Sequence, residues 1–380
     1  MEWKLKDLTV DGKGSYGIGA SAVPYQEDKL TYLRITDIND DGSLNFSDLK
    51  SVDAEDAEKY ILKENDIVFA RTGNSTGRSY FYEKQHGTFV YAGFLIKFSL
   101  DPNKVNPRIL KYYTHSKPYY DWVSSFDTGA TRGNINAKTY GDMEIELPSR
   151  KIQNRIVSVL SSLDRKIELN NKINADLEEM AQAIFKNWFV DFEPFKDGKF
   201  VDSELGMIPE GWKVGTLEDL IAIKYGKDHK KLEEGTFPVY GSGGLMRFVN
   251  SWLYDGESVL IPRKGTLDNI MYVCEKFWTV DTMFFSTPKM DYVMKYVYNY
   301  IKRFDFSKMN EGTSVPSNTA ARLNKMQILI PNQEVLKMYD ETLCPNYNKR
   351  KMNDKESSRL SLLRDTLLPR LMSGELEVPE

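Results

Sequence analysis

The chain has 380 residues, more than one ordinary domain, and at about 150 residues per domain the length predicts two or three domains. Hydrophobic residues make up 41% of the chain and aromatic residues 12%, a content that excludes disorder as the main state. The 51 basic and 55 acidic side chains give a formal charge of −4, so any surface that binds nucleic acid has to be local.

The two cysteines, Cys274 and Cys344, are too few for a disulfide framework, which indicates a reducing compartment. The first residues lack the apolar core of a signal peptide, and no stretch reaches the roughly 18 apolar residues that a membrane-spanning helix needs. We therefore expect a cytoplasmic protein.

Residues 1–149 are predicted to form a strand-rich globule. Short runs of β-branched and aromatic residues alternate with Gly, Asn, Asp and Pro turn signals; the runs are TYLRITDI, DIVFA, TFVYAGFLIKF and MEIELP. Apolar residues three and four positions apart add a helix near 106–114.

Residues 150–190 are predicted to form one long helix. Apolar positions recur with heptad spacing, which is typical of a helix that pairs with another helix. The pairing positions expected here are Ile156, Leu163, Ile173, Leu177, Met180 and Ile184. About 40 helical residues make a rod of roughly 60 Å, too long to be stable without a neighbour.

The second half follows the same plan. Residues 191–211, rich in Pro and Gly, are predicted to be a solvated linker, 212–331 a second strand-rich globule, 332–376 a second long helix and 377–380 a tail. In the second helix we expect Leu360, Leu363 and Leu367 to pair with the first helix. Its polar middle, NKRKMNDKESSR, predicts looser packing there or a contact with another subunit.

An internal repeat explains this plan. Gly129-Ala130-Thr131 is followed by IELP, and 183 residues later Gly312-Thr313-Ser314 is followed by ILIP. Further upstream, IVFARTGNST around Arg71 resembles VLIPRKGTLD around Arg263. The fold class is therefore α+β, with two mixed globules, two long antiparallel coiled-coil helices and pseudo-two-fold internal symmetry.

Motifs for the common enzyme classes are absent from the sequence. It has no GxxxxGK[ST] phosphate loop, no GxSxG elbow, and neither the glycine-rich cofactor loop nor the Asn/Asp-Pro-Pro-aromatic motif of a methyltransferase. The three histidines, His86, His115 and His229, are not spaced as metal ligands. We therefore expect no catalytic residue, metal or cofactor in this chain.

One acidic cluster keeps an enzyme hypothesis open. Asp191, Glu193 and Lys196 in DFEPFK resemble the carboxylates and lysine of a metal-dependent nuclease. A solvated segment after the first long helix is the favoured interpretation.

Polar and basic loops recur at matching places in both halves. Arginine can bind guanine with two hydrogen bonds, asparagine can read adenine, and serine or lysine can contact phosphate. The candidate DNA-binding residues are Arg71, Asn74, Arg78, Arg132 and Asn134 in the first globule, and Arg263, Lys264, Asn269, Ser317 and Asn318 in the second.

At four places the sequence resembles the specificity (S) subunit of type I restriction-modification systems. The carrying motifs are IPEGW at 208–212, NRIVSVLSSLDRKIELNNKI at 154–173, AIFKNWFVDFEPF at 183–195 and LLRDTLLPRLMSGEL at 362–376. The chain departs from that family where the helices begin, with Pro148-Ser149-Arg150 in place of Pro-Pro followed by Glu-Gln.

The resemblance implies two target recognition domains that read the halves of a split double-stranded DNA sequence. It implies two methyltransferase (M) subunits and restriction (R) subunits as partners, which would use S-adenosylmethionine, ATP and Mg²⁺. A rod of about 60 Å would limit the separation of the half-sites to near 17 base pairs. A scaffold that binds protein without reading DNA is the second alternative, beside the nuclease.

Overall fold

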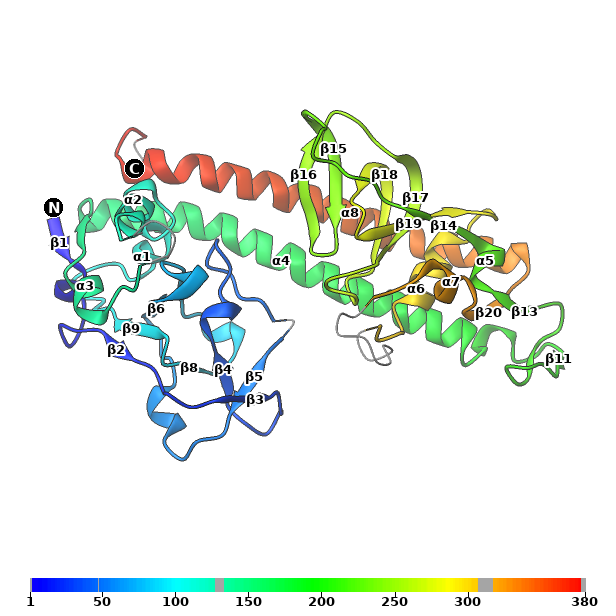
Figure 1. The fold of residues 1–380 in the computed structure, drawn as a ribbon, viewed down its shortest axis with the longest axis horizontal. Helices are drawn as coiled ribbons and strands as arrows, with labels where there is room; N and C mark the ends of the chain where they lie inside the picture. Colours follow the sequence, from blue (N-terminus) through cyan, green and yellow to red (C-terminus); the bar gives the residue numbers. More distant parts are fainter. Residues whose placement is uncertain (1, 47, 127–132, 307–316, 377–380) are drawn as a thin grey trace. The chain divides into compact units, whose positions relative to one another are not determined.

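The computed structural model describes residues 2–46, 48–126, 133–306 and 317–376, and the chain divides into two compact units. Unit 1 combines the residues up to Leu169 with those from Glu356 onward, whereas unit 2 is the uninterrupted stretch Asn170–Lys355. Both units mix strands and helices, so the predicted α+β class is confirmed (Figure 1).

Two long helices supply a segment to each unit. α4 (Arg150–Phe189) and α8 (Gln333–Met372) each contain 40 residues. Their first residues and their last residues are both 183 positions apart, which is the offset of the sequence repeat. The compact units therefore divide each long helix, whereas the sequence-based domains set the helices apart from the globules.

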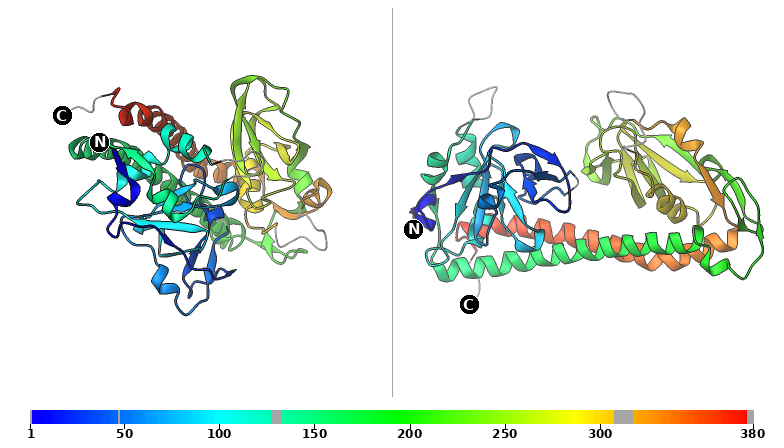
Figure 2. Two further views of the ribbon diagram at one scale, coloured as in Figure 1. Left: turned by 60° about the vertical axis from the view of Figure 1, so that its left-hand side comes forward. Right: turned by 90° about the horizontal axis from the view of Figure 1, so that it is seen from below.

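In unit 1, the segments of α4 and α8 are antiparallel neighbours (Figure 2). Asp164 of α4 pairs with Arg364 of α8 at 3.1 Å, and Lys166 pairs with Glu356 at 3.2 Å. From Asp164 to Lys166 the residue number in α4 rises, while that of the paired residue in α8 falls from 364 to 356, so the two helices are antiparallel.

In unit 2, the same two helices pair through polar side chains. Asn353 donates to Asn174 at 2.8 Å, and Glu178 forms an ion pair with Arg350. Asn170 and Asn353, which are 183 positions apart, are both fully buried. Because a buried amide needs partners, such positions favour one register of the helix pair over others.

α8 continues through two prolines, Pro345 and Pro369. Each lacks the N–H that would bond the carbonyl four residues earlier, which disfavours a helix interior. Burial of neighbouring side chains offsets the cost of these prolines. Leu343 and Tyr347 are buried in the core of unit 2, and Leu368 is buried in the core of unit 1.

Unit 1 contains two four-stranded sheets, ordered β2-β9-β6-β7 and β3-β5-β4-β8, and the pair β1-β10. The first sheet is antiparallel, and the second includes one parallel pair, β4 with β8. The strands are β1 (Glu2–Lys4), β2 (Ser15–Tyr16), β3 (Ala22–Pro24), β4 (Thr31–Leu33), β5 (Lys50–Val52), β6 (Asp66–Ala70), β7 (Ser79–Phe81), β8 (Phe89–Tyr91), β9 (Leu95–Ser99) and β10 (Glu144–Glu146). Its other helices are α1 (Arg108–Tyr113), α2 (Lys117–Ser124) and α3 (Ala137–Gly141), with 3₁₀ turns η1 (Leu5–Leu8), η2 (Ile35–Asp37), η3 (Ala57–Tyr60), η4 (Gly73–Ser75) and η5 (Lys84–His86).

Unit 2 contains one six-stranded sheet, ordered β14-β19-β17-β18-β15-β16, and the pairs β13-β20 and β11-β12. The strands are β11 (Phe200–Val201), β12 (Ile208–Pro209), β13 (Lys213–Thr216), β14 (Ile221–Tyr225), β15 (Glu234–Gly241), β16 (Gly244–Val249), β17 (Tyr254–Pro262), β18 (Met271–Thr279), β19 (Met283–Pro288) and β20 (Gln327–Ile330). Its other helices are α5 (Leu217–Leu220), α6 (Met294–Ile301), α7 (Ala320–Asn324) and the 3₁₀ turn η6 (Glu193–Phe195).

The two units share one framework, so the predicted repeat is confirmed in the fold. The order β2-β9-β6-β7 corresponds to β14-β19-β17-β18, and β1-β10 corresponds to β13-β20. The N-caps of α3 and α7 are Asn136 and Thr319, again 183 positions apart. The units differ in what is added: the sheet β3-β5-β4-β8 in unit 1 and the hairpin β15-β16 in unit 2.

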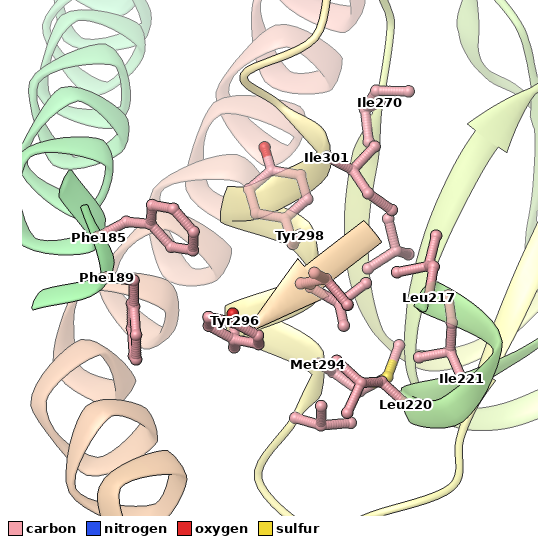
Figure 3. Close-up of a cluster of buried hydrophobic side chains, with 14 of the residues drawn as sticks. Phe185, Phe189, Leu217, Leu220, Ile221, Ile270, Met294, Tyr296, Tyr298 and Ile301 are labelled. Atoms are coloured by element: carbon pink, nitrogen blue, oxygen red, sulfur yellow. The ribbon is translucent and has the colours of Figure 1, made fainter. Parts of the chain in front are cut away.

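Aromatic side chains form the core of unit 2 where α4, α6 and α8 meet (Figure 3). Phe185 and Phe189 of α4 face Tyr296 of α6, with ring centroids 5.6 and 4.6 Å apart. Tyr339 of α8 is buried in the same cluster. Since a fully buried large side chain contributes about 1.5–3 kcal/mol relative to exposure, this core holds both long-helix segments against the unit.

In unit 1, the corresponding core joins the long helices to α1. Ile156 and Leu160 of α4 and Leu371 of α8 lie in one buried cluster with Ile109 and Leu110 of α1. The long-helix segments are therefore part of the core of each unit.

The predicted pairing positions differ in their burial. Ile156 is buried in the unit 1 core, Leu367 packs against that core, and Ile184 packs against the unit 2 core. The half-buried positions are Leu163, Ile173, Leu177 and Leu360.

Two of the predicted pairing positions are exposed. Met180 is 52% exposed and Leu363 is 45% exposed. In α4 the aromatic residues Phe185 and Phe189 turn to the core and set which side of the helix is buried, and in α8 the adjacent Arg364 turns toward α4. Heptad spacing predicts only which residues face the partner helix. Packing against the globule changes which residues of the helix are buried.

The stretch 191–211, predicted as a solvated linker, is part of unit 2 and contacts other residues of that unit. β11 pairs with β12, and the rings of Phe192 and Phe195 lie 5.7 and 5.1 Å from the ring of Trp212. Apolar side chains next to its prolines and glycines thus give this stretch a defined structure.

Candidate nucleic-acid interface

In unit 1, the guanidinium of an arginine lies over the ring of a tyrosine beside the antiparallel sheet. Arg71 follows β6 directly, and its guanidinium carbon lies 5.0 Å from the ring centroid of Tyr16 in β2. The Nε atom of Arg71 donates to Oδ1 of Asn134 at 3.3 Å. The backbone is fixed as well, because Arg71 N–H donates to the carbonyl of Phe94 and its own carbonyl accepts from Ile135 N–H at 3.0 Å.

In unit 2, the equivalent arginine has the same arrangement. Arg263 follows β17 directly, and its guanidinium carbon lies 5.5 Å from the ring centroid of Tyr225 in β14. Arg263 N–H donates to the carbonyl of Thr282 at 2.8 Å, and its carbonyl accepts from Asn318 N–H at 3.0 Å. One terminal nitrogen lies 3.4 Å from the carbonyl of Asp281, a long contact.

The strand register places each tyrosine in the same position. Tyr16 lies opposite Ile96, and Ile96 lies opposite Phe69, which is two residues before Arg71. The equivalent row in unit 2 is Tyr225, Phe284 and Ile261. Two different sequences therefore build one geometry twice.

A glycine follows each tyrosine where two backbones come close. A Cβ atom at Gly17 would lie 2.2 Å from the carbonyl oxygen of Tyr91, and one at Gly226 would lie 2.0 Å from that of Val280. Only glycine fits such a contact, so the Tyr-Gly pair is part of the framework in both units.

Neither arginine is neutralised within its unit. Arg34, Arg78 and Arg108 each form an ion pair with a carboxylate. Across the described ranges, by contrast, no acidic side chain pairs with Arg71 or Arg263. Their charges are therefore available to a ligand.

In unit 1, the structure brings together only part of the predicted residue set. Asn134 joins Arg71, and Asn74 is exposed in the turn η4. Arg78 donates to Asp40 at 2.7 Å and to the carbonyl of Ile38, so its guanidinium holds the loop around residue 40. Arg132 lies outside the described residues.

In unit 2, the predicted residues gather around Arg263. Lys264 is exposed and pairs through its backbone with Ser317. Asn318 is fully buried and donates from its amide to the carbonyl of Pro262 at 2.9 Å, which makes it a support for the loop. Asn269 donates to the carbonyl of Ser242, which joins this loop to the turn between β15 and β16.

Sequence reasoning missed Tyr16 and Tyr225. Their signal was present, because both units contain a Tyr-Gly pair ahead of the arginine. These pairs are 209 positions apart, whereas the helices are 183 apart and the arginines 192, so comparison at a single offset does not align them.

A buried ionic cluster ties α1 to the long helices in unit 1. Asp164 of α4 accepts from Tyr112 at 2.9 Å and pairs with Lys111 and Arg364, both at 3.1 Å. Burial, the largest influence, would raise the pKa of Asp164, but the charges of Lys111 and Arg364 together hold that pKa below its ordinary value.

Unit 2 has a matching ionic cluster at β17, the strand that Arg263 follows. Lys295 of α6, only 5% exposed, lies 3.0 Å from Glu257 of β17 and 2.7 Å from Asp340 of α8. Burial alone would lower the pKa of Lys295, but the two carboxylates raise it above its ordinary value. The ammonium stays charged and holds the sheet to α8.

The acidic cluster of the nuclease hypothesis forms local ion pairs. Asp191 pairs with Lys186 and Glu193 pairs with Lys196, both at 2.5 Å. Within the described ranges, no three His, Cys, Asp or Glu side chains are grouped to hold a metal ion. None of the described helices combines the length and apolarity needed to cross a membrane.

Known proteins share this fold and sequence pattern. The family model described as "Type I restriction modification DNA specificity domain" matches residues 5–179 and 209–340. The specificity subunit of the MjaIX type I restriction enzyme of Methanocaldococcus jannaschii is 29% identical over 299 residues, which cover 71% of this chain and 69% of that one.

The HindI specificity subunit of Haemophilus influenzae is 21% identical, with 84% of this chain and 88% of that one covered. A solved S subunit of a type I restriction-modification system from M. genitalium superposes with a TM-score of 0.57 at 19% identity, covering 98% and 96% of the two chains. That superposition shows that the two chains share a fold.

Proposed function

The chain belongs to the family of type I restriction-modification DNA specificity proteins, and on that basis we propose that it selects the DNA sequence on which such a complex acts. In this proposal unit 1 and unit 2 each read one half of a split double-stranded target. The chain performs no catalysis, in keeping with its family.

The repeated arginine-tyrosine pair is the observation that carries this proposal. Arg71 and Arg263 occupy equivalent places, each without a carboxylate partner among the described residues. A positive side chain held on a rigid framework suits DNA, which offers phosphates for affinity and base edges for selectivity. The added elements of each unit, which differ, would allow two different half-sites.

The helices α4 and α8 are proposed to link the readers and to present binding surfaces to partners. The partners are two methyltransferase subunits, which use S-adenosylmethionine, and restriction subunits, which use ATP and Mg²⁺. The assembly would act in the cytoplasm. Met180 and Leu363, exposed on these helices, would suit contacts with a methyltransferase.

Selection from random double-stranded DNA tests the proposal. The full chain, assembled with its methyltransferase subunits, should enrich one split motif at salt high enough to suppress non-specific phosphate contacts. Methylation mapping in cells that carry the complete system should find modified bases in the same motif. Equal binding of random and selected DNA would contradict the proposal and favour a protein-binding scaffold.

The nuclease alternative has its own outcome. The purified chain with Mg²⁺ should leave DNA intact, because Asp191 and Glu193 already form ion pairs with lysines. Cleavage that is lost in Asp191→Asn would instead support the nuclease.

A further inference from the structure

We propose that Arg71 and Arg263 each read a guanine, one in each half-site, and that Tyr16 and Tyr225 are positioning residues which orient them. This inference rests on the proposed function and names the base that the repeated pair selects. It requires the two guanines to occupy equivalent places in otherwise different half-sites.

The contacts of the Arg71 side chain leave an edge with two nitrogens that suits a base. Its guanidinium carbon lies over the ring of Tyr16, and its Nε atom donates to Asn134. The edge that remains carries the two terminal nitrogens. In Arg263 one of these nitrogens also donates to the carbonyl of Asp281 at 3.4 Å, which leaves its second N–H for a ligand. This planar fork matches O6 and N7 of guanine in the major groove, the commonest specific arginine contact.

The stacking makes this fork selective. A free arginine side chain has many rotamers, and part of that freedom is lost when it binds. A ring held in a β-strand restricts that freedom before DNA arrives, which lowers the cost of a two-bond contact. A phosphate can also accept two bonds from such a fork, but that contact would be the same for every DNA sequence, so motif selection separates the two assignments.

Each tyrosine is itself held in place, although by different contacts. The hydroxyl of Tyr16 accepts from the backbone N–H of Ala137, the first residue of α3, at 3.1 Å. The ring of Tyr225 packs edge-on against Phe284 with centroids 5.0 Å apart. Different supports that keep the same Tyr-Arg pair indicate that the pair itself is what both units retain.

The surroundings of the two forks differ, which predicts different flanking bases. Asn134 is exposed beside Arg71, whereas Asn318 is buried beneath Arg263 and bonds the backbone. In unit 2 the exposed Lys264 and the turn at Ser242 adjoin the arginine loop. The shared base is therefore the guanine, and its neighbours are specific to each unit.

The test compares motifs selected by variants of the full chain assembled with its methyltransferase subunits. Arg71→Lys and Arg263→Lys keep the charge and remove the fork. Each should reduce the preference for one guanine, in one half-site only, by about tenfold, equivalent to about 1.4 kcal/mol. Arg359→Lys, at an exposed position of α8, is the matched control and should select the wild-type motif.

The tyrosine variants separate positioning from folding. Tyr16→Leu and Tyr225→Leu should lose the same preference as the matching lysine variant, while the salt dependence of binding stays unchanged because no charge is removed. Tyr225→Phe retains the ring and should retain the preference, whereas Tyr16→Phe also loses the contact with Ala137 and should retain most of it. The arginine variants keep both tyrosines, so they test the guanine contacts even if the leucine variants unfold.

The outcomes distinguish this inference from the proposed function. If the wild-type assembly selects no motif, the proposed function fails and the inference fails with it. If it selects a split motif that the lysine variants leave unchanged, only the inference is overturned. An equal loss of binding to all sequences would assign the arginines to phosphate and would also overturn it.

Discussion

At the scale of single residues, His115 shows how its surroundings fix the charge of a side chain. Its Nδ1 atom lies 3.2 Å from the hydroxyl of Tyr120. Burial lowers its pKa from 6.5 to about 4, although the nearby Asp41 carboxylate acts in the opposite direction. The folded protein therefore keeps His115 neutral at a pH where the unfolded chain binds a proton.

Stability should fall as the pH falls from 6.5 toward about 4, because the unfolded state binds more protons in that window. Replacing His115 by Asn removes the titrating group and keeps an amide near Tyr120. Denaturant unfolding at about pH 7 and about pH 4.5 should show a smaller loss in His115→Asn than in the wild type. An equal loss of unfolding free energy in the two proteins would show that His115 does not contribute to the pH dependence of stability.

Gly17 illustrates a steric requirement of one residue. Because an added Cβ would meet the carbonyl oxygen of Tyr91 at 2.2 Å, Gly17→Ala should destabilise unit 1 by about 1–3 kcal/mol. Gly19 has no atom within 4 Å of its added Cβ, so Gly19→Ala should stay within about 1 kcal/mol of the wild type. Equal thermal unfolding of the two variants would contradict this assignment.

At the scale of elements, the attachment of α6 to β17 and α8 depends on one buried ammonium. Lys295→Met keeps the volume and leaves Glu257 and Asp340 without their cation, so we expect a loss of about 3–5 kcal/mol. Chemical denaturation measures this loss. Lys302→Met, at an exposed position just after α6, should change stability by less than about 0.5 kcal/mol.

The long helices could be predicted from the sequence because their signal is local. Heptad spacing and the 183-residue offset placed both helices within two residues of their observed starts, at Arg150 and Gln333. The buried side of each helix could not be predicted in full. Met180 fits the heptad yet is exposed, because the globule competes with the partner helix for the apolar side.

The candidate site was predictable only in part. Arg71 and Arg263 were found because their loops resemble one another in sequence. Tyr16 and Tyr225 were not, since they reach the arginines through pairing with β9 and β19, strands more than 50 residues away in the chain. The sequence also does not show which side chains already have partners within the unit. Arg78 was predicted to bind DNA, but its guanidinium donates to Asp40.

At the scale of the whole molecule, both long helices run without interruption through the division between units. If they set the separation of the two readers, an insertion of seven residues after Leu169 and another before Glu356 should lengthen each helix by about 10.5 Å. The selected motif should then contain about three more base pairs between its halves, at 3.4 Å per pair.

The control inserts the same seven residues beside Leu205 in the hairpin between β11 and β12, where the side chain is exposed. That variant should select the original spacing. Motif selection measures the spacing between the half-sites for both variants. An unchanged spacing in the variant with longer helices would show that helix length does not set the distance between the two readers.

The composition of unit 1 also affects how the protein is made. Its core includes Leu368 and Leu371, which follow the whole of unit 2 in the chain and so leave the ribosome after it. Until then the N-terminal lobe lacks part of its hydrophobic interior, whereas the contiguous unit 2 has all of its sequence. A nascent chain that stops directly after unit 2 would thus expose the apolar side of the unit 1 segment of α4 to proteases and chaperones.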